Sequence, residues 1–177
     1  MADSSNVIGH TISASTRLAM GYVDRLLFGV TADQFARFAS CGGVTIESNH
    51  PCFILGHLSL YAPRVVKELG GEMAGIEPTV AFQDVFSKDA KCVDDPDANI
   101  YPPMDEVVDA FRAGHERAIS VLEQTSDELF QADNPNEPMR PKFPTTGQMH
   151  AFYLGGHLMM HLGQFSGWRR SAGLGSA

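Results

Sequence analysis

The sequence predicts an all-α fold: a four-helix bundle in up-down-down-up order, with a long crossover between its second and third helices. The first observation behind this prediction is that four segments repeat apolar residues at helical spacing. The second is the connection from Gly70 to Pro103, where prolines and glycines interrupt any helical pattern. Antiparallel neighbours commonly need only about two to eight connecting residues, whereas this connection can return the chain to the opposite end of the bundle. The 177 residues suit a single domain, 1–177, with loose ends expected at 1–5 and 173–177.

The first two helices are bounded by glycine and proline. We expect the first from about Val7 to Phe28, because its apolar residues recur mostly at helical spacing and Gly29 follows. A short helical turn is expected over residues 31–38, with Thr31 as its cap. The second helix begins near Pro51, since a proline suits the first turn, where its missing N–H costs little. Gly70-Gly71 ends this helix.

The third and fourth helices follow the crossover. The third opens after Pro102-Pro103 and runs to about Gln124, with Asp105 and Glu106 in the first turn, where they complement the helix dipole. Prolines mark residues 131–144 as a loop. The fourth helix is expected from about residue 145 to 171 and is apolar on nearly every side, which indicates burial.

Composition excludes several classes of function. The net charge is -8, and no basic run exists beyond Arg169-Arg170, so binding to nucleic acid or to an anionic membrane surface is disfavoured. The start of the chain does not resemble a signal peptide, and no apolar run reaches the roughly 18 residues of a membrane span. The cysteines, an odd and widely spaced set, suit neither disulfides nor a thiolate zinc site. We therefore expect a cytoplasmic protein whose metal site, if present, uses histidine.

Three histidines form the candidate metal site. His157 and His161 are four residues apart, so on a helix both imidazoles lie on one face and can reach one ion. In the predicted bundle the second and fourth helices run antiparallel, which puts His57 about 9 Å and His161 about 14 Å from the same end. Three buried imidazoles without partners would each carry an unsatisfied polar group. A shared ion would remove that cost.

The residues around these histidines resemble the DinB/YfiT-like family of small metal-binding four-helix bundles. That family places one histidine on the second helix after leucine and glycine, and the motif H-x-x-x-H-x-G-Q on the fourth. Here the matching segments are 55–57 and 157–164, the latter followed by Trp168-Arg169-Arg170. The resemblance covers nearly the whole chain. One departure is that Leu158, Met159 and Met160 make the motif more apolar than in many relatives.

The resemblance implies a cofactor and a reaction. It implies one divalent transition metal, Zn or Ni above others, bound by His57, His157 and His161. Imidazole suits these ions, and three protein ligands leave coordination positions open. Several relatives are thiol S-transferases or thiol-dependent isomerases that use low-molecular-weight thiols such as bacillithiol or mycothiol, and relatives are often dimers. A homodimer and a small-molecule substrate are therefore expected here.

Other residues could support the site. His150 is seven residues before His157, on the same helical side, and either orients a ligand or is a polar residue near the helix start. Gln164 is expected to make a hydrogen bond that fixes the site or the helix packing. Tyr61 and His115 either line a pocket or belong to the core.

Three functions stay open from the sequence. The leading hypothesis is a metal-dependent thiol S-transferase acting on small electrophiles. The first alternative is a metal-dependent hydrolase of small esters or amides, which the absence of a carboxylate at general-base spacing beside the histidines weakens. The second alternative is a stress-related metal-binding or interaction bundle without turnover.

Overall fold

The computed structural model describes residues 5–177, and this part of the chain is mostly helical, as the sequence predicts. Residues 1–4, within the end expected to be loose, lie outside the described part. At the other end Leu174 exchanges hydrogen bonds with Arg169. In chain order the elements are α1 (Val7–Leu27), α2 (Ala32–Phe35), β1 (Ala39–Cys41), β2 (Val44–Ile46), α3 (Pro51–Leu58), α4 (Tyr61–Glu68), α5 (Val80–Phe86), α6 (Met104–Gln124), α7 (Asp127–Gln131), the 3-10 helix η1 (Glu137–Met139), α8 (Thr146–Ala151), the π-helix η2 (Phe152–His157) and α9 (Leu158–Ser171).

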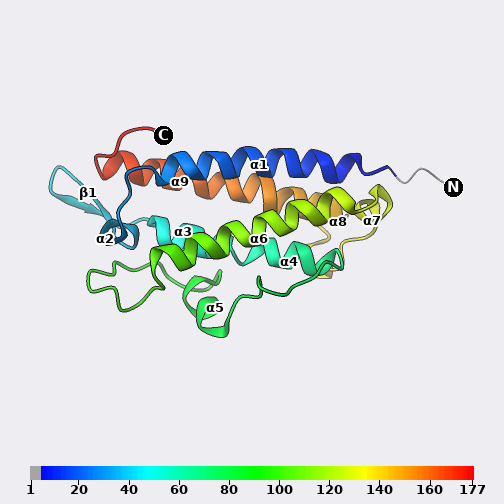
Figure 1. Ribbon diagram of the computed structural model, residues 1–177, viewed down its shortest axis with the longest axis horizontal. Helices are drawn as coiled ribbons and strands as arrows, with labels where there is room; N and C mark the ends of the chain where they lie inside the picture. Colours follow the sequence, from blue (N-terminus) through cyan, green and yellow to red (C-terminus); the bar gives the residue numbers. More distant parts are fainter. Residues whose placement is uncertain (1–4) are drawn as a thin grey trace.

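The long helices lie side by side along one axis (Figure 1). α1 packs against α6, η2 and α9, while α6 packs against α3 and α4 and α3 packs against α9. The chain colours in Figure 1 show that α1 and the α8–η2–α9 helix run toward one end of the molecule, and α3–α4 and α6 toward the other. This arrangement brings α3, which carries His57, alongside α9, which carries His161 and begins directly after His157.

The predicted second helix is broken into α3 and α4. Ser59 and Leu60 separate the two, and the turn is closed by hydrogen bonds from their N–H groups to Leu55 and His57. The physical cause is Pro63, which has no N–H to bond the carbonyl of Ser59 four residues earlier and whose ring crowds that carbonyl. The break comes directly after His57 and ends the turn on which that side chain lies.

The crossover contains a helix that the sequence reading treats as loop. α5 begins after Thr79, whose hydroxyl accepts a hydrogen bond from the N–H of Phe82. Phe82 and Phe86 are buried, so this helix covers the bundle. The later acidic segment is ordered as well, because the Asp95 carboxylate accepts hydrogen bonds from three main-chain N–H groups, those of residues 99–101.

A short antiparallel hairpin is a second feature that the sequence reading misses. β1 pairs with β2, with Cys41 opposite Val44. Gly42 and Gly43 form the turn with φ values of 59° and 81°. A two-residue hairpin turn of this kind needs positive φ at both positions, which glycine adopts without strain.

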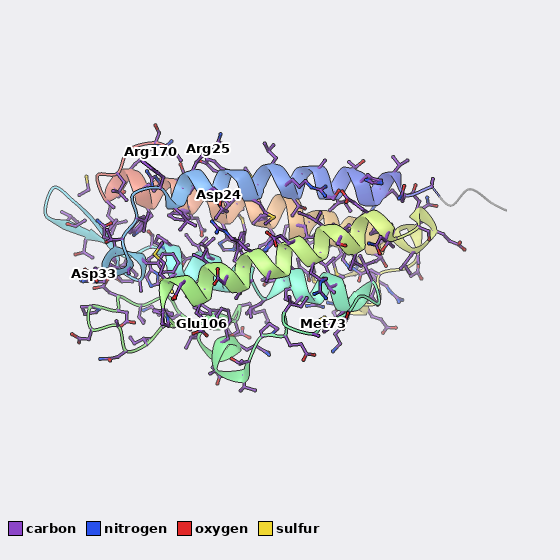
Figure 2. All side chains as sticks on the ribbon, in the orientation of Figure 1. Asp24, Arg25, Asp33, Met73, Glu106 and Arg170 are labelled. Atoms are coloured by element: carbon purple, nitrogen blue, oxygen red, sulfur yellow. The ribbon has the colours of Figure 1, made fainter. Side chains whose placement is uncertain are left out.

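Several charged residues lie at the edges of the bundle. Figure 2 shows Arg25 of α1 and Arg170 of α9 at one edge of the molecule and Glu106, at the start of α6, toward the other. Within residues 5–177, no helix has both the length and the apolar character needed to cross a membrane.

Candidate metal centre

The structure brings His57, His157 and His161 together between α3 and the η2–α9 helix. His57 lies in the last turn of α3, His157 ends the π-helical turn η2, and His161 follows one turn later in α9. The ring centroids are 4.7 to 5.4 Å apart, and each residue offers a ring nitrogen within 4.8 Å of the others. The three side chains are only 7–9% exposed. His57 thus forms one nearly enclosed cluster with two residues that are 100 or more positions later in the sequence.

Hydrogen bonds fix the orientation of two of the imidazoles. The Nδ1–H of His57 donates to the carbonyl oxygen of Phe86 at 2.8 Å. The Nδ1–H of His161 donates to Oε1 of Gln164 at 2.9 Å, and this oxygen also accepts from the side-chain amide of Asn49 at 3.1 Å. Because a carbonyl oxygen only accepts, both histidines carry their proton on Nδ1 and present the Nε2 lone pair. Metal-binding histidines are commonly held in this way by an outer partner.

Gly56 allows the carbonyl partner of His57 to approach. A Cβ built on Gly56 would lie 2.4–2.5 Å from three atoms of the Phe86 ring. The ring therefore packs directly on the glycine, and the same residue turns its carbonyl oxygen toward the neighbouring His57. In the leucine-glycine-histidine sequence before the break in the second helix, the glycine thus leaves room for the Phe86 ring. In contrast, Gly163 and Gly167 of α9 have no such neighbour, so they do not mark a close helix approach.

The π-helical turn decides which residues of the fourth helix reach the cluster. In a regular α-helix, His150 and His157 would share one side. η2 inserts a wider turn between them, and His150 instead bonds Glu68 of α4, with its Nε2 2.9 Å from Oε2. The imidazole of His150 is fully buried at that place and is outside the three-histidine cluster. Nothing in the hydrophobic periodicity signals the π turn.

The remaining sequence candidates have different positions. His115 is buried on α6, and its Nδ1–H donates to the carbonyl of Phe111 in its own helix at 2.7 Å, so it belongs to the core. Tyr61 is half-buried and lies with its ring centroid 4.4 Å from that of His157 and 5.0 Å from that of His57. Tyr61 therefore forms a wall of the cluster.

Aromatic residues complete that wall, and the sequence reading does not identify them. Phe152 and Tyr153 lie 5.5 and 6.4 Å from the ring of His157. The carbonyl of Phe86 and the amide of Asn49 are also missed. A main-chain carbonyl has no signature in the sequence, because every residue carries one.

Burial keeps the clustered imidazoles uncharged. It lowers the pKa of His57 and of His161, and it lowers the pKa of His157 to about 4; repulsion from the neighbouring imidazoles adds to the effect at His157 and His161. At neutral pH all three are therefore neutral and keep a nitrogen lone pair available. Within residues 5–177, the groups that could hold an ion together are these three histidines, with no carboxylate or thiolate among them.

The donor set fits a divalent transition metal. The Nε2 atoms of His157 and His161 are 3.1 Å apart, close to the roughly 3.3 Å between two nitrogens on a tetrahedral ion with bonds of about 2.05 Å. Imidazole nitrogen suits Zn, Ni, Cu and Fe. The buried Nδ1 of His157 has no hydrogen-bond partner in the protein, so this ring, unlike the other two, has no outer support.

A comparison with protein families finds a match that includes this site. A family model described as the DinB superfamily matches residues 9–165, which include the three histidines and Gln164. No curated protein and no solved structure matches the chain.

Proposed function

This chain belongs to the DinB superfamily, and from that membership and the histidine cluster we propose that it is a metal-dependent thiol S-transferase acting on small electrophiles. The observation that carries the proposal is the cluster of three neutral imidazoles without a carboxylate, two of which are held by a hydrogen bond to an outer partner. In this proposal the fold is an up-down-down-up four-helix bundle, which positions His57 next to His157 and His161. We also propose that the protein is cytoplasmic, because low-molecular-weight thiols stay reduced in that compartment.

His57, His157 and His161 are the residues that would hold the ion, with Zn or Ni as the preferred metals. Three neutral ligands would leave the full charge on a divalent ion, which when bound would lower the pKa of a thiol or a water beside it. Phe86 and Gln164 keep two of the three rings in one orientation. This fixed orientation reduces the rearrangement that binding requires.

The aromatic wall defines where the electrophile would lie. Tyr61, Phe152 and Tyr153 surround the ring of His157 and offer apolar faces rather than charged groups. In the reaction the thiol sulfur forms a bond to the electrophilic atom, and the leaving group departs with its bonding pair. The thiol proton passes to solvent, since the cluster contains no carboxylate base. The apolar wall limits water at the site and thereby limits competing hydrolysis.

The low exposure of the cluster favours a second candidate, a metal-binding bundle without turnover. Each histidine is at most 9% exposed, which restricts the approach of a substrate. The two candidates differ in whether a reactant reaches the site. Hydrolysis of small esters or amides is a less favoured third candidate, because the cluster offers no carboxylate to act as a general base.

A thiol-transfer assay tests the proposal. Protein loaded with Zn or Ni is mixed with a panel of small thiols and chlorodinitrobenzene, and the thioether product is followed. We expect a metal-dependent rate that His157→Ala abolishes and that His10→Ala, which changes an exposed histidine of α1, leaves unchanged. No rate with any thiol, from protein that holds its metal, contradicts the transferase and supports the binding bundle.

A further inference from the structure

A main-chain carbonyl of the π-helical turn η2 accepts a hydrogen bond from a side chain of α1, a helix that carries none of the three histidines. η2 spans Phe152–His157, and within it the carbonyl of Leu154 lies 3.2 Å from the hydroxyl oxygen of Thr16. Both residues are fully buried. A π-helical turn replaces the usual i→i+4 hydrogen bonds by i→i+5 bonds, and such turns are frequent at functional sites. A buried carbonyl in this turn needs a partner, and Thr16 provides one.

Thr16 differs from the other threonine of α1 in what its hydroxyl contacts. The hydroxyl of Thr11 donates to the carbonyl of Val7 in its own helix and is exposed. The hydroxyl of Thr16 shares its single proton between two carbonyl oxygens, that of Ile12 in its own helix at 2.9 Å and that of Leu154 on the neighbouring helix at 3.2 Å. Thr11 is therefore a matched control, since it has the same bond within the helix and no bond to the π turn.

The π turn allows the fourth helix to make contacts on two different sides, one before the turn and one after it. Before the turn, His150 bonds Glu68 of α4. After it, His157 and His161 face His57 of α3. One residue fewer or more in an α-helix rotates the following side chains by about 100° and shifts them by about 1.5 Å. Relaxation of η2 to a regular α-helix would therefore turn the two histidines away from His57 as long as His150 kept its partner.

We propose that Thr16 is a positioning residue of the metal centre, whose hydroxyl stabilises the π turn and thereby holds His157 and His161 toward His57. The inference rests on the proposed metal site but not on the proposed reaction. It concerns a residue on a helix that carries no ligand. The glycine pair Gly155-Gly156 within the turn makes the regular helix less favoured there, but glycine has no side chain with which to bond the carbonyl of Leu154.

The test compares metal binding by Thr16→Val, Thr16→Ser and Thr11→Val with that of the wild type. The probe is Co²⁺, read by its ligand-field spectrum and by competition with a chromophoric chelator. We expect Thr16→Val to weaken Co²⁺ binding by about tenfold or more, the range for loss of an outer support, and to change the spectrum. Thr16→Ser retains the hydroxyl and is expected to bind like the wild type, as is Thr11→Val.

A hydrogen-exchange measurement and a second variant show whether the hydroxyl of Thr16 stabilises the π turn. Hydrogen exchange of the amides in η2 and early α9, measured without metal, is expected to be faster in Thr16→Val than in Thr11→Val. If Thr16→Val does not fold, Thr16→Ala removes the same hydroxyl and is read in the same way. Wild-type-like affinity and spectrum in a folded variant without the hydroxyl overturn the role of Thr16 alone. A wild type that takes up no Co²⁺ overturns the metal site and this inference with it, whereas metal binding without thiol transfer overturns only the proposed reaction.

Discussion

Replacement of Gly56 by alanine tests how the chain orients His57. The new Cβ would lie 2.4–2.5 Å from three atoms of the Phe86 ring, a distance at which the ring must move. Phe86 is fully buried, and it also supplies the carbonyl that accepts the Nδ1–H of His57. We expect the substitution to displace the ring and its carbonyl together, so that stability and metal affinity fall together.

The size of the effect follows from three contributions. Overpacking of a filled core costs about 1–3 kcal/mol, and loss of one buried hydrogen bond costs about 1 kcal/mol. Alanine is favoured over glycine within a helix by about 1 kcal/mol, which offsets part of this cost. The expected net loss is about 1–3 kcal/mol, a decrease of about 2–12 °C in Tm for a chain of this length. Loss of the outer support of one ligand lowers metal affinity by about tenfold.

The assay is thermal or urea unfolding of the chelator-treated protein, followed by a metal titration of the folded variant. Gly167→Ala is the matched control, since Gly167 lies in α9 with open space around it. That variant is expected to gain up to about 1 kcal/mol and to bind metal normally. The reasoning is refuted if Gly56→Ala is as stable as the wild type and binds metal with equal affinity.

Three further predictions concern the outer support, a buried cation and pH. Gln164→Ala removes the acceptor of the His161 Nδ1–H, so metal affinity measured by chelator competition should fall by about tenfold; unchanged affinity would argue that this bond does not orient the ring. Arg169 is 3% exposed and donates to the carbonyls at the end of α1, so Arg169→Ala should cost about 3 kcal/mol in urea unfolding, whereas Arg170→Ala, on the exposed side of the same turn, should cost little. Burial lowers the pKa of His115 to about 4, below its value of about 6.5 in the unfolded chain. As the pH falls, the imidazole of His115 is therefore protonated in the unfolded state before it is protonated in the folded state. The free energy of unfolding is unaffected by this residue above about pH 6.5 and decreases as the pH falls from about 6.5 to about 4. In metal-free protein, His115→Gln should make the urea midpoint depend less on pH in this window; an unchanged slope would contradict the assignment.

The sequence predicts the parts of the site that depend on periodicity. The four-residue spacing of His157 and His161 needs only a helix, and a helix is present on both sides of His161. The mostly helical fold and the family are likewise confirmed. The meeting of His57 with the other two needs the long crossover, and the structure shows the two helices in contact.

The sequence does not reveal the features that depend on single backbone contacts. The π turn changes the phase of the fourth helix without changing its apolar composition. Periodicity therefore puts His150 on the side of His157, whereas the structure agrees with the other reading, a polar residue near the start of that helix. The carbonyl of Phe86 lies in a segment read as loop, although the Thr79 cap and the apolar residues after it indicate a helix. The pair Gly42-Gly43 is likewise typical of a two-residue hairpin turn. A cap followed by apolar residues and a glycine pair are thus local signals for these two elements, whereas the π turn has no such signal.

The most direct test of the account is the metal content of the purified protein and its histidine variants. We predict about one divalent transition-metal ion per chain in the wild type and in the control His10→Ala. His57→Ala, His157→Ala and His161→Ala should each lose most of that ion while retaining the helical circular dichroism spectrum. Full metal content in a folded His157→Ala variant would contradict the claim that these three histidines hold the ion together.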